Sequence, residues 1–308
     1  MSNNALLSVG LATYQRPEML RNALESLVQI SIPKDVQVQL ILCENSIDNK
    51  SSLLLDEFKE RLKIDAQYVQ EPNKGIVFAR NKILQVAISS GANFLAFFDD
   101  DEQVAPDWIE SMYRCIVENE AHVVQGRVEP VFPPDESLKE AKKYFPSSPK
   151  ERTGALLREA YTNNVLFDLA FVARRKLRFD LRLNDSGGSD SLFFSQLAKE
   201  GAKIIFCNEA LVTETVPESR ASIKWLRRRI YREGFNKKRI EKIMGGSKTG
   251  FWEAMKQLIN YFKFRMLEKK NISDEKKVEY RFASLRSLGM FHSIIGIKIS
   301  YYDKIDGF

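Results

Sequence analysis

The sequence predicts an α/β fold with a mostly parallel central sheet flanked by helices, followed by a C-terminal helical appendage. Short apolar runs that are typical of buried strands alternate with longer segments whose apolar side chains recur at helical spacing. Polar residues stand where several expected strands end, which is where such sheets bind ligands. Basic residues concentrate after about residue 220. We therefore expect an α/β domain over residues 1–220 and a basic amphipathic helical extension over residues 221–308.

Strands and helices are expected to alternate through residue 128. The expected strands cover residues 6–12, 36–43 and 66–69, a run that ends at Asp99, and residues 122–128. The expected helices begin at Pro17, cover residues 53–62, extend from a turn at residues 72–75 through Ile88, and cover residues 106–117. This alternation is typical of βαβ units, in which neighbouring strands run parallel.

The pattern is less regular after residue 130. Residues 130–160 are rich in proline and charge, which predicts a long loop with one short helix, serving as a linker or as a substrate lid. Ser189 or Asp190 is expected to cap the next helix. The remaining expected elements are strand-like runs at residues 162–167 and 169–173, a helix at residues 191–200, and strands at residues 203–206 and 211–216.

Three adjacent carboxylates, Asp99, Asp100 and Asp101, follow the aromatic run at residues 94–98. They repel one another unless a cation neutralises them. Because adjacent side chains on a strand point to opposite faces, Asp99 and Asp101 are expected to share a face and Asp100 to point the other way. Two carboxylates on one face suit Mg²⁺ or Mn²⁺. The alternative is an acidic turn that caps the helix beginning near Pro106.

Other expected strand ends are also polar, at Thr13-Tyr14 and Glu44-Asn45. The first strand is not followed by GxGxxG, and the chain has no GxxxxGKS/T loop, so a bound diphosphate needs another neutraliser. A metal ion on Asp99 and Asp101 would supply one. A second cluster of polar residues covers residues 184–190 and ends at Asp190. Its two glycines, Gly187 and Gly188, would let the backbone approach a ligand closely.

Composition narrows the class of protein. The 308 residues are 44% hydrophobic and 29% charged with a net charge of +6, which is ordinary for a soluble globular protein. Three scattered cysteines suggest neither a disulfide framework nor a zinc cluster and favour a reducing compartment. Only two histidines leave carboxylates as the plausible metal ligands. Neither a signal peptide nor a transmembrane helix is expected, because the start is polar and no run of 18 apolar residues occurs.

Together these features resemble the family 2 glycosyltransferases, which have the GT-A fold with its Rossmann-like central sheet. The matching motifs keep the family's order over residues 6–215 and are Thr13-Tyr14-Gln15-Arg16-Pro17, Glu44-Asn45-Ser46, Asn73-Lys74-Gly75 with Ala79-Arg80-Asn81, Asp99-Asp100-Asp101, and Gly187-Gly188-Ser189-Asp190. Residues 213–222, followed by Trp225 and the arginines at 227–229, further resemble bacterial glucosyltransferases of exopolysaccharide assembly of the succinoglycan type.

The resemblance implies metal-dependent, inverting sugar transfer from a nucleotide sugar. UDP is the family's commonest nucleotide, and the closer resemblance to the glucosyltransferases suggests glucose as the sugar. The implied donor-binding residues are Thr13, Tyr14, Arg16, Glu44, Asn45, Gly75, Arg80, Asp99 and Asp100. Asp99 and Asp101 form the implied DxD site for Mn²⁺ or Mg²⁺, and Asp190 is the implied general base. The chain departs from the family where Ser189 replaces a glutamate and where a histidine of the metal shell is missing; Glu214 or water would replace that histidine.

Some assignments stay open at this point. Glu44 and Arg80 form either nucleoside contacts or a structural ion pair, and Asn163 and Asn164 either line the donor-sugar or acceptor site or form a turn. Two rival functions are a nucleotidyltransferase and a non-catalytic sugar-nucleotide-binding protein. A nucleotidyltransferase usually carries a Gly-rich basic loop near its N-terminus, and residues 13–17 do not form one.

The basic C-terminal segment interleaves arginine and lysine with aromatic residues, from Lys224 onward. It is either a solvated helical face or a membrane-surface element, and we favour the second because basic residues are attracted to anionic leaflets while apolar ones embed in them. No nucleic-acid-binding fold is visible, so no nucleic-acid partner is expected. We therefore expect a cytoplasmic enzyme, peripheral on the inner face of the plasma membrane, that acts on a saccharide or lipid-linked acceptor in surface polysaccharide synthesis.

Overall fold

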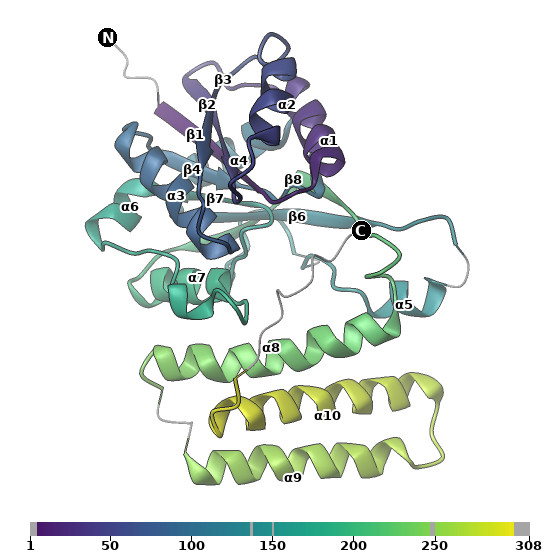
Figure 1. Ribbon diagram of the computed structural model, residues 1–308. Coiled ribbons are helices and arrows are strands. Elements are labelled where there is room, and N and C mark those ends of the chain that lie inside the picture. The colour runs from purple at the N-terminus through teal and green to yellow at the C-terminus, as the bar shows by residue number, and fades with distance from the viewer. Residues whose placement is uncertain (1–4, 136–137, 150, 247–249, 299–308) are drawn as a thin grey trace. The chain divides into compact units, whose positions relative to one another are not determined.

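The computed structural model describes residues 5–135, 138–149, 151–246 and 250–298 (Figure 1). The chain divides into two compact units, each described here by itself. The first contains residues 1–131, 147–184 and 189–215, and the second contains residues 132–146, 185–188 and 216–308. The second unit therefore takes in two short segments from the middle of the sequence. The expected boundary at residue 220, between an α/β domain and a helical extension, remains a prediction.

An eight-stranded sheet organises the first unit, in the order β3-β2-β1-β4-β7-β6-β8-β5. Its strands are β1 (Ala5–Thr13), β2 (Val36–Glu44), β3 (Asp65–Gln70), β4 (Phe94–Phe97), β5 (Glu102–Val104), β6 (Val123–Val131), β7 (Val165–Asp168) and β8 (Ile204–Thr215). The strands β3, β2, β1 and β4 pair in parallel, as do β6 and β8. Because β7 is antiparallel to both β4 and β6, these two strands point the same way. The carboxyl ends of six strands thus lie along one edge of the sheet.

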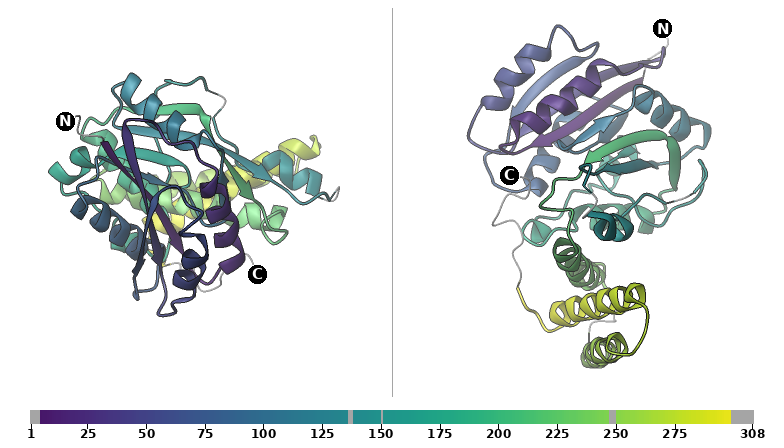
Figure 2. Two further views of the ribbon diagram at one scale, coloured as in Figure 1. Left: turned by 90° about the horizontal axis from the view of Figure 1, so that it is seen from above. Right: turned by 90° about the vertical axis from the view of Figure 1, so that its right-hand side faces the viewer.

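Helices cover both faces of this sheet, as Figure 2 shows from two sides. One core packs α1 (Pro17–Val28), α2 (Lys50–Phe58) and α4 (Trp108–Glu118) against one face. A second core packs α3 (Ile76–Ser89), α6 (Leu169–Arg174) and α7 (Ser189–Lys199) against the other. Consecutive residues of β2 alternate between the two cores, with Leu40 in the first and Ile41 in the second. The continuous apolar runs in the sequence therefore reflect burial on both faces, and the predicted α/β class is confirmed.

Three expectations about local structure are wrong. Residues 169–173 form α6 and not a strand, because the Asp168 side chain accepts a hydrogen bond from Phe171 N (3.0 Å) and caps a helix. The two strands expected between residues 203 and 216 are one, β8, with an irregular register against β6 after Gly126. The strand before the acidic triplet ends at Phe97, so Asp99, Asp100 and Asp101 lie in a turn. Strand alternation therefore cannot explain where their side chains point.

A buried asparagine joins β6, β7, β8 and α4. Asn164 is fully buried, and its Nδ2 donates to Arg127 O (2.9 Å) and Ala210 O (2.8 Å), while its Oδ1 accepts from Trp108 Nε1 (2.8 Å). Gly126 leaves room for this side chain, since a Cβ there would lie 2.4 Å from Asn164 Nδ2. The amide is therefore structural, and of the two alternatives left open for Asn164, lining a ligand site is excluded by its burial.

Replacing this amide is expected to be strongly destabilising. Asn164→Ala leaves one indole N–H and two carbonyl groups without their partner, and each buried unsatisfied group costs about 1–3 kcal/mol. We expect the free energy of unfolding to fall by about 3 kcal/mol or more, measured by urea denaturation. Asn163→Ala, at the adjacent half-buried position, is the matched control. Equal stabilities of the two variants would contradict this role for Asn164.

Three long helices make up most of the second unit: α8 (Ile223–Ile243), α9 (Phe251–Glu268) and α10 (Asp274–Ile294). The middle helix is α10, which packs on both α8 and α9 (Figure 1). Gly234 and Gly289 bring α8 and α10 close together, since a Cβ at either would lie 2.1 Å from a carbonyl oxygen of the other helix. A short helix, α5 (Lys139–Tyr144), leads to Phe145, whose ring stacks on Trp225 of α8 with centroids 5.6 Å apart. The expected helical appendage is confirmed.

Candidate active site

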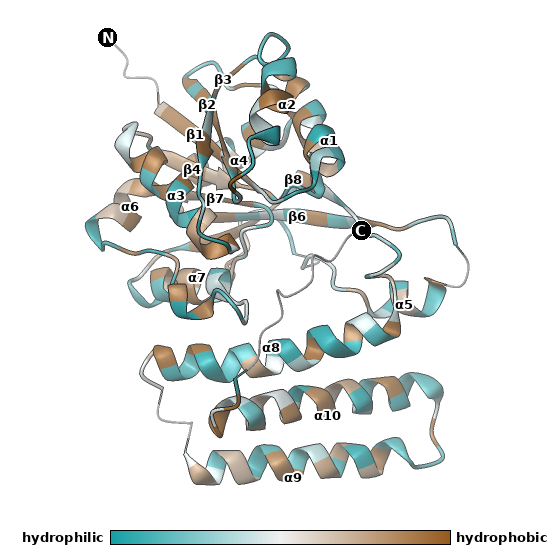
Figure 3. Cartoon of the chain, viewed as in Figure 1, coloured by the Kyte–Doolittle hydropathy of each residue, from teal (hydrophilic) through white to brown (hydrophobic). Residues whose placement is uncertain are grey.

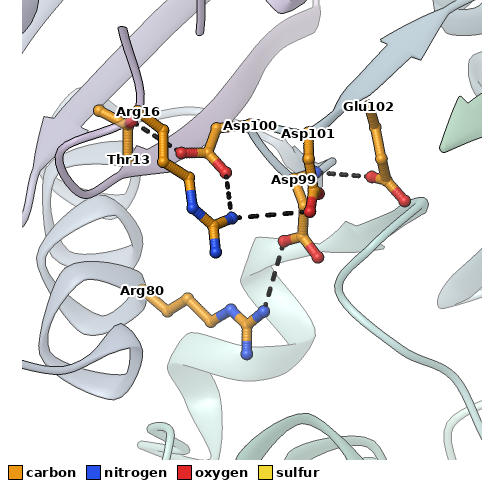
Figure 4. A network of polar contacts seen from close by, with 7 residues as sticks. All are labelled: Thr13, Arg16, Arg80, Asp99, Asp100, Asp101 and Glu102. Carbon is orange, nitrogen blue, oxygen red and sulfur yellow. Dashed lines mark hydrogen bonds and ion pairs between the residues drawn. The ribbon is translucent and has the colours of Figure 1, made fainter. Parts of the chain in front are cut away.

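The acidic triplet lies where β1, β2 and β4 end, and its side chains separate there (Figure 4). Thr13 Oγ1, at the end of β1, donates to Asp100 Oδ2 (2.7 Å). Arg16, just before α1, places its Nη1 3.3 Å from Asp100 Oδ1 and 3.6 Å from Asp101 Oδ2. Asp100 is thus directed toward the β1–α1 connection and is bound there by a hydroxyl and a guanidinium group.

Asp99 points away from Asp100 and Arg16, and its ion-pair partner is Arg80. Arg80 extends from α3 and is 8% exposed, and its Nη2 lies 3.5 Å from Asp99 Oδ1. The Asp99 side chain is 39% exposed, compared with 7% for Asp100 and 9% for Asp101. Of the three carboxylates, Asp99 is therefore the one most accessible to a ligand from solution.

A fourth carboxyl group, which the sequence analysis missed, stands directly behind the triplet. Glu102 is 2% exposed, and its Oε2 accepts a hydrogen bond from Asp99 N (2.7 Å). A second bond, from Glu102 N to Asp99 O (3.1 Å), closes the turn. The only sequence signal for this role was that an acidic residue continues the run of three aspartates. Glu102 therefore fixes the backbone that carries the triplet.

Burial, and after it the repulsion between neighbouring carboxylates, raises the pKa of three of these carboxyl groups. Burial raises the pKa of Asp100 to about 7, against the opposing effect of Arg16. Partial burial also raises the pKa of Asp99; the charge of Arg80 lowers it, and the charges of Asp101 and Asp190 raise it. The pKa of Glu102 is raised well above its usual value by burial and then by Asp99 and Asp101. A cation bound beside these carboxyl groups would favour their ionised forms and lower these pKa values.

Asp190 lies in the first turn of α7, where its Oδ1 accepts a hydrogen bond from Ser191 N (2.8 Å). The charge of Asp190 is one of those that raise the pKa of Asp99. The neighbouring Ser189 is 2% exposed. Gly187 and Gly188 precede the helix with φ values of 78° and 84°, a left-handed conformation that glycine adopts without strain. The polar cluster expected at residues 184–190 thus ends in a glycine turn, after which Asp190 lies in the first turn of α7.

Glu44 and Asn45 are engaged in holding neighbouring loops. The two carboxylate oxygens of Glu44 accept hydrogen bonds from Ser46 Oγ (3.1 Å) and Ser51 N (3.1 Å). Because Arg80 lies against Asp99, the alternative of a Glu44–Arg80 ion pair is wrong. Asn45 donates to Glu71 O (3.0 Å) and Asn73 O (2.7 Å), and it accepts from Gly75 N (2.8 Å). Their contact with a nucleoside remains a prediction.

An aromatic ring and a lysine stand near the same edge of the sheet. Tyr14 follows β1 and is half-buried, with Lys74 Nζ 5.7 Å from the centre of its ring. Gly75 precedes α3 as its N-cap residue with φ 132°, and a Cβ there would collide with the side chain of Asn184. Glycine is therefore favoured at position 75 by its backbone conformation and by the space available. The ring of Tyr14 offers a flat surface of the kind on which a nucleobase stacks.

The carboxylates can be tested against the requirements of a divalent metal ion. Glu214 lies opposite Glu102 in the β5–β8 ladder and raises its pKa, so it is close to the site. Across the part of the chain that the structure describes, however, no three His, Cys, Asp or Glu side chains are grouped so that they could hold a metal ion. Asp99 and Asp101 are two hard oxygen donors, and Mg²⁺ or Mn²⁺ commonly binds to two carboxylates with waters and phosphate oxygens completing the shell. The donor set fits such an ion, whereas a third ligand from Glu214 is not assembled.

Comparisons with known proteins agree on one family and one fold. Residues 8–178 match the model of the family described as glycosyl transferase family 2. The succinoglycan biosynthesis protein ExoM of Rhizobium meliloti (strain 1021) is 33% identical over 264 residues, which is 82% of this chain and 84% of that protein. A second relative, glycosyltransferase GlyA of Streptococcus pneumoniae, is 24% identical over 39% of this chain and 16% of its own length.

Solved structures give the same result at the level of fold. A crystal structure of S. aureus TarS 1–349 in complex with UDP has a TM-score of 0.53 and 14% identity, covering 98% of this chain and 94% of that one. The complex of the same fragment with UDP-GlcNAc has a TM-score of 0.53, 15% identity and coverage of 98% and 95%. The expected GT-A fold is confirmed.

Proposed function

Because this chain belongs to glycosyltransferase family 2, we propose that it transfers a sugar from a UDP-sugar to a hydroxyl group of a saccharide or lipid-linked acceptor in bacterial exopolysaccharide synthesis. The observation that carries the proposal is the separation of the acidic triplet at the strand ends, with Asp100 bound to Thr13 and Arg16, and Asp99 held by Arg80. The complexes of TarS with UDP and UDP-GlcNAc support the choice of nucleotide, and the name of ExoM supports the pathway. Glucose is our choice of donor sugar.

The proposed division of roles follows from accessibility and charge. Asp100, directed toward β1 and 7% exposed, would bind the ribose of the nucleoside, with the Tyr14 ring beside the base. Arg16 and Arg80 would orient the donor from the two sides of the triplet. Asp99 and Asp101 would hold Mn²⁺ or Mg²⁺, which when bound neutralises the leaving diphosphate as a Lewis acid.

Asp190 would accept the proton of the acceptor hydroxyl as that oxygen attacks the anomeric carbon, with inversion of configuration. Its position at the start of α7 fixes the carboxylate, since Oδ1 is held by Ser191 N. The second carboxylate oxygen, Oδ2, would then receive the proton. Since Ser189 is buried and not acidic, Asp190 would act without a neighbouring carboxylate in its own motif.

A panel of nucleotide sugars tests this proposal. Thermal shifts of the full chain with UDP-glucose, UDP-GlcNAc, GDP-mannose and UDP, each with and without Mn²⁺, should rise most for a UDP-sugar with the metal, because a ligand that binds only the folded state stabilises it. Release of UDP in the presence of a saccharide acceptor then distinguishes an enzyme from a binding protein. Stabilisation by UDP-sugars without any turnover would favour the non-catalytic alternative.

Removing the carboxylate that binds Thr13 and Arg16 is expected to weaken nucleotide binding. A hydrogen bond to a charged group contributes about 1.5–3 kcal/mol, so Asp100→Ala should raise the Kd for UDP by about tenfold or more. Isothermal titration calorimetry measures this change. Asp107→Ala removes an exposed carboxylate nearby in the sequence and should leave the Kd unchanged. Unaltered UDP affinity in Asp100→Ala would exclude the ribose-binding role.

We also propose that the protein is cytoplasmic and associates with the inner face of the plasma membrane. Among the described residues, no helix combines the length and apolar character needed to cross a bilayer. Association would therefore use the surface of the C-terminal helices, which carry most of the excess basic charge.

A further inference from the structure

One helix of the second unit exposes large apolar side chains along a single face. In α9, Trp252, Ile259, Phe262 and Met266 are 83%, 60%, 56% and 70% exposed. Their spacing of seven, three and four residues places them on one side of an α-helix. Phe251, at the start of the helix, is also 70% exposed. Of fourteen large apolar side chains exposed among the described residues, five come from this helix, which is a concentration and not a scatter of single residues.

The opposite side of α9 packs within the unit. Its most buried residues, Ala254, Gln257 and Glu268, lie about half a turn away from the exposed apolar residues and face α10. Figure 3 shows apolar segments along α9. The exposed apolar side chains therefore do not take part in the packing of α9 on α10, and they are available to contact another molecule.

The exposed face also carries positive charge. Lys256 and Lys263 are exposed, and at one turn after Trp252 and Ile259 they border the apolar side chains. Both acidic residues of α9 are paired: Glu253 with Lys238 of α8 (3.0 Å), and Glu268 with Arg281 of α10 and with Arg265 (2.5 Å). The lysines therefore determine the sign of charge on this face. We call Trp252, Lys256, Ile259, Phe262, Lys263 and Met266 the α9 face.

We propose that the α9 face is a docking surface for an anionic lipid bilayer. A helix that lies in a membrane interface buries aromatic and aliphatic side chains at the acyl boundary and directs lysines to anionic headgroups, which is the arrangement of the α9 face. The anionic lipids of the inner leaflet attract the two lysines because their charges are opposite. The inference rests on the proposed function, because a lipid-linked acceptor would be presented at this same leaflet.

The test uses the full chain and two variants that separate the apolar and electrostatic contributions. Wild-type protein should sediment with vesicles of phosphatidylglycerol and phosphatidylcholine in equal parts at low salt, and weakly with pure phosphatidylcholine. Trp252→Ser/Ile259→Ser should raise the lipid concentration for half-binding about tenfold or more by removing interfacial burial. Lys256→Glu/Lys263→Glu should raise it by a similar factor and abolish the dependence on phosphatidylglycerol.

Matched controls change the same residue types elsewhere on the surface. Leu53→Ser/Leu156→Ser removes two apolar side chains that are 62% and 74% exposed, and Lys34→Glu/Lys199→Glu reverses two exposed lysines. Both should bind vesicles like the wild type. Circular dichroism of each variant confirms folding, and calorimetric binding of UDP reports separately on the proposed function.

The vesicle-binding results either support or overturn the proposal. Loss of vesicle binding in the α9-face variants alone, with UDP binding retained, supports the proposal even if the donor sugar has been assigned wrongly. Equal vesicle binding by α9-face and control variants overturns it. So does a stable oligomer by light scattering that the α9-face variants convert to monomer without any vesicle binding by the wild type, because the face would then contact a second copy of the chain.

Discussion

Asp190→Asn is expected to lower kcat by about 10²–10⁴-fold, the usual contribution of a general base, while the Kd for the UDP-sugar changes little. Asparagine retains an oxygen that accepts the hydrogen bond from Ser191 N. The substitution therefore separates proton transfer from this contact in the first turn of α7. Initial rates of UDP release, with donor binding measured by calorimetry, check the prediction.

Asp185→Asn is the matched control, an exposed aspartate five positions earlier in the sequence. It should retain nearly full activity. If Asp190→Asn loses donor affinity by the same factor as rate, Asp190 contributes to binding and not to proton transfer. If the rate is unchanged, Asp190 is not the general base, and its contact with Ser191 N in the first turn of α7 accounts for the residue.

Asp101→Asn is expected to lower kcat/KM by about 10²-fold or more and to remove the dependence on Mn²⁺, since a metal Lewis acid supplies several kcal/mol of charge stabilisation in the transition state. The substitution keeps the size of the side chain and removes the charge that attracts Arg16, whose Nη1 lies 3.6 Å from Asp101 Oδ2. Metal titration of the rate, in parallel with EDTA treatment of the wild type, measures the effect.

Glu110→Gln neutralises an exposed carboxylate on α4 and should leave the metal dependence unchanged. A wild-type enzyme that works fully after EDTA treatment would contradict the metal role of Asp101. So would an Asp101→Asn variant with the Mn²⁺ requirement of the wild type.

The acidic triplet shows how far sequence reasoning reached and where it failed. The expectation that Asp100 turns away from Asp99 and Asp101 was derived from strand alternation, but β4 ends at Phe97 and the three residues lie in a turn. What directs Asp100 is the pair of contacts with Thr13 and Arg16. Glu102 was not identified because its role depends on burial and on one backbone bond to Asp99, and neither leaves a pattern in the sequence.

Residues 169–173 show the same limit on a smaller scale. An apolar run of this length fits a buried strand or a buried helix equally well. The choice depended on Asp168, which ends β7 and whose side chain caps α6. Asn164 was ambiguous for a related reason: a polar residue beside a strand lines a site or satisfies buried carbonyls, and only its three partners on α4, β6 and β8 decide which.

The sequence by itself determined the α/β class, the order of the early strands and the positions where polar motifs end them, because periodicity and composition act within a few residues along the chain. Only the tertiary structure decided which cation faces which carboxylate. Arg16 reaches Asp100 across 84 residues and Arg80 reaches Asp99 across 19, through strands and helices that pair without regard to separation in sequence. In the same way, the pattern of α9 predicted an amphipathic helix, but packing on α10 determined which of its faces remains exposed.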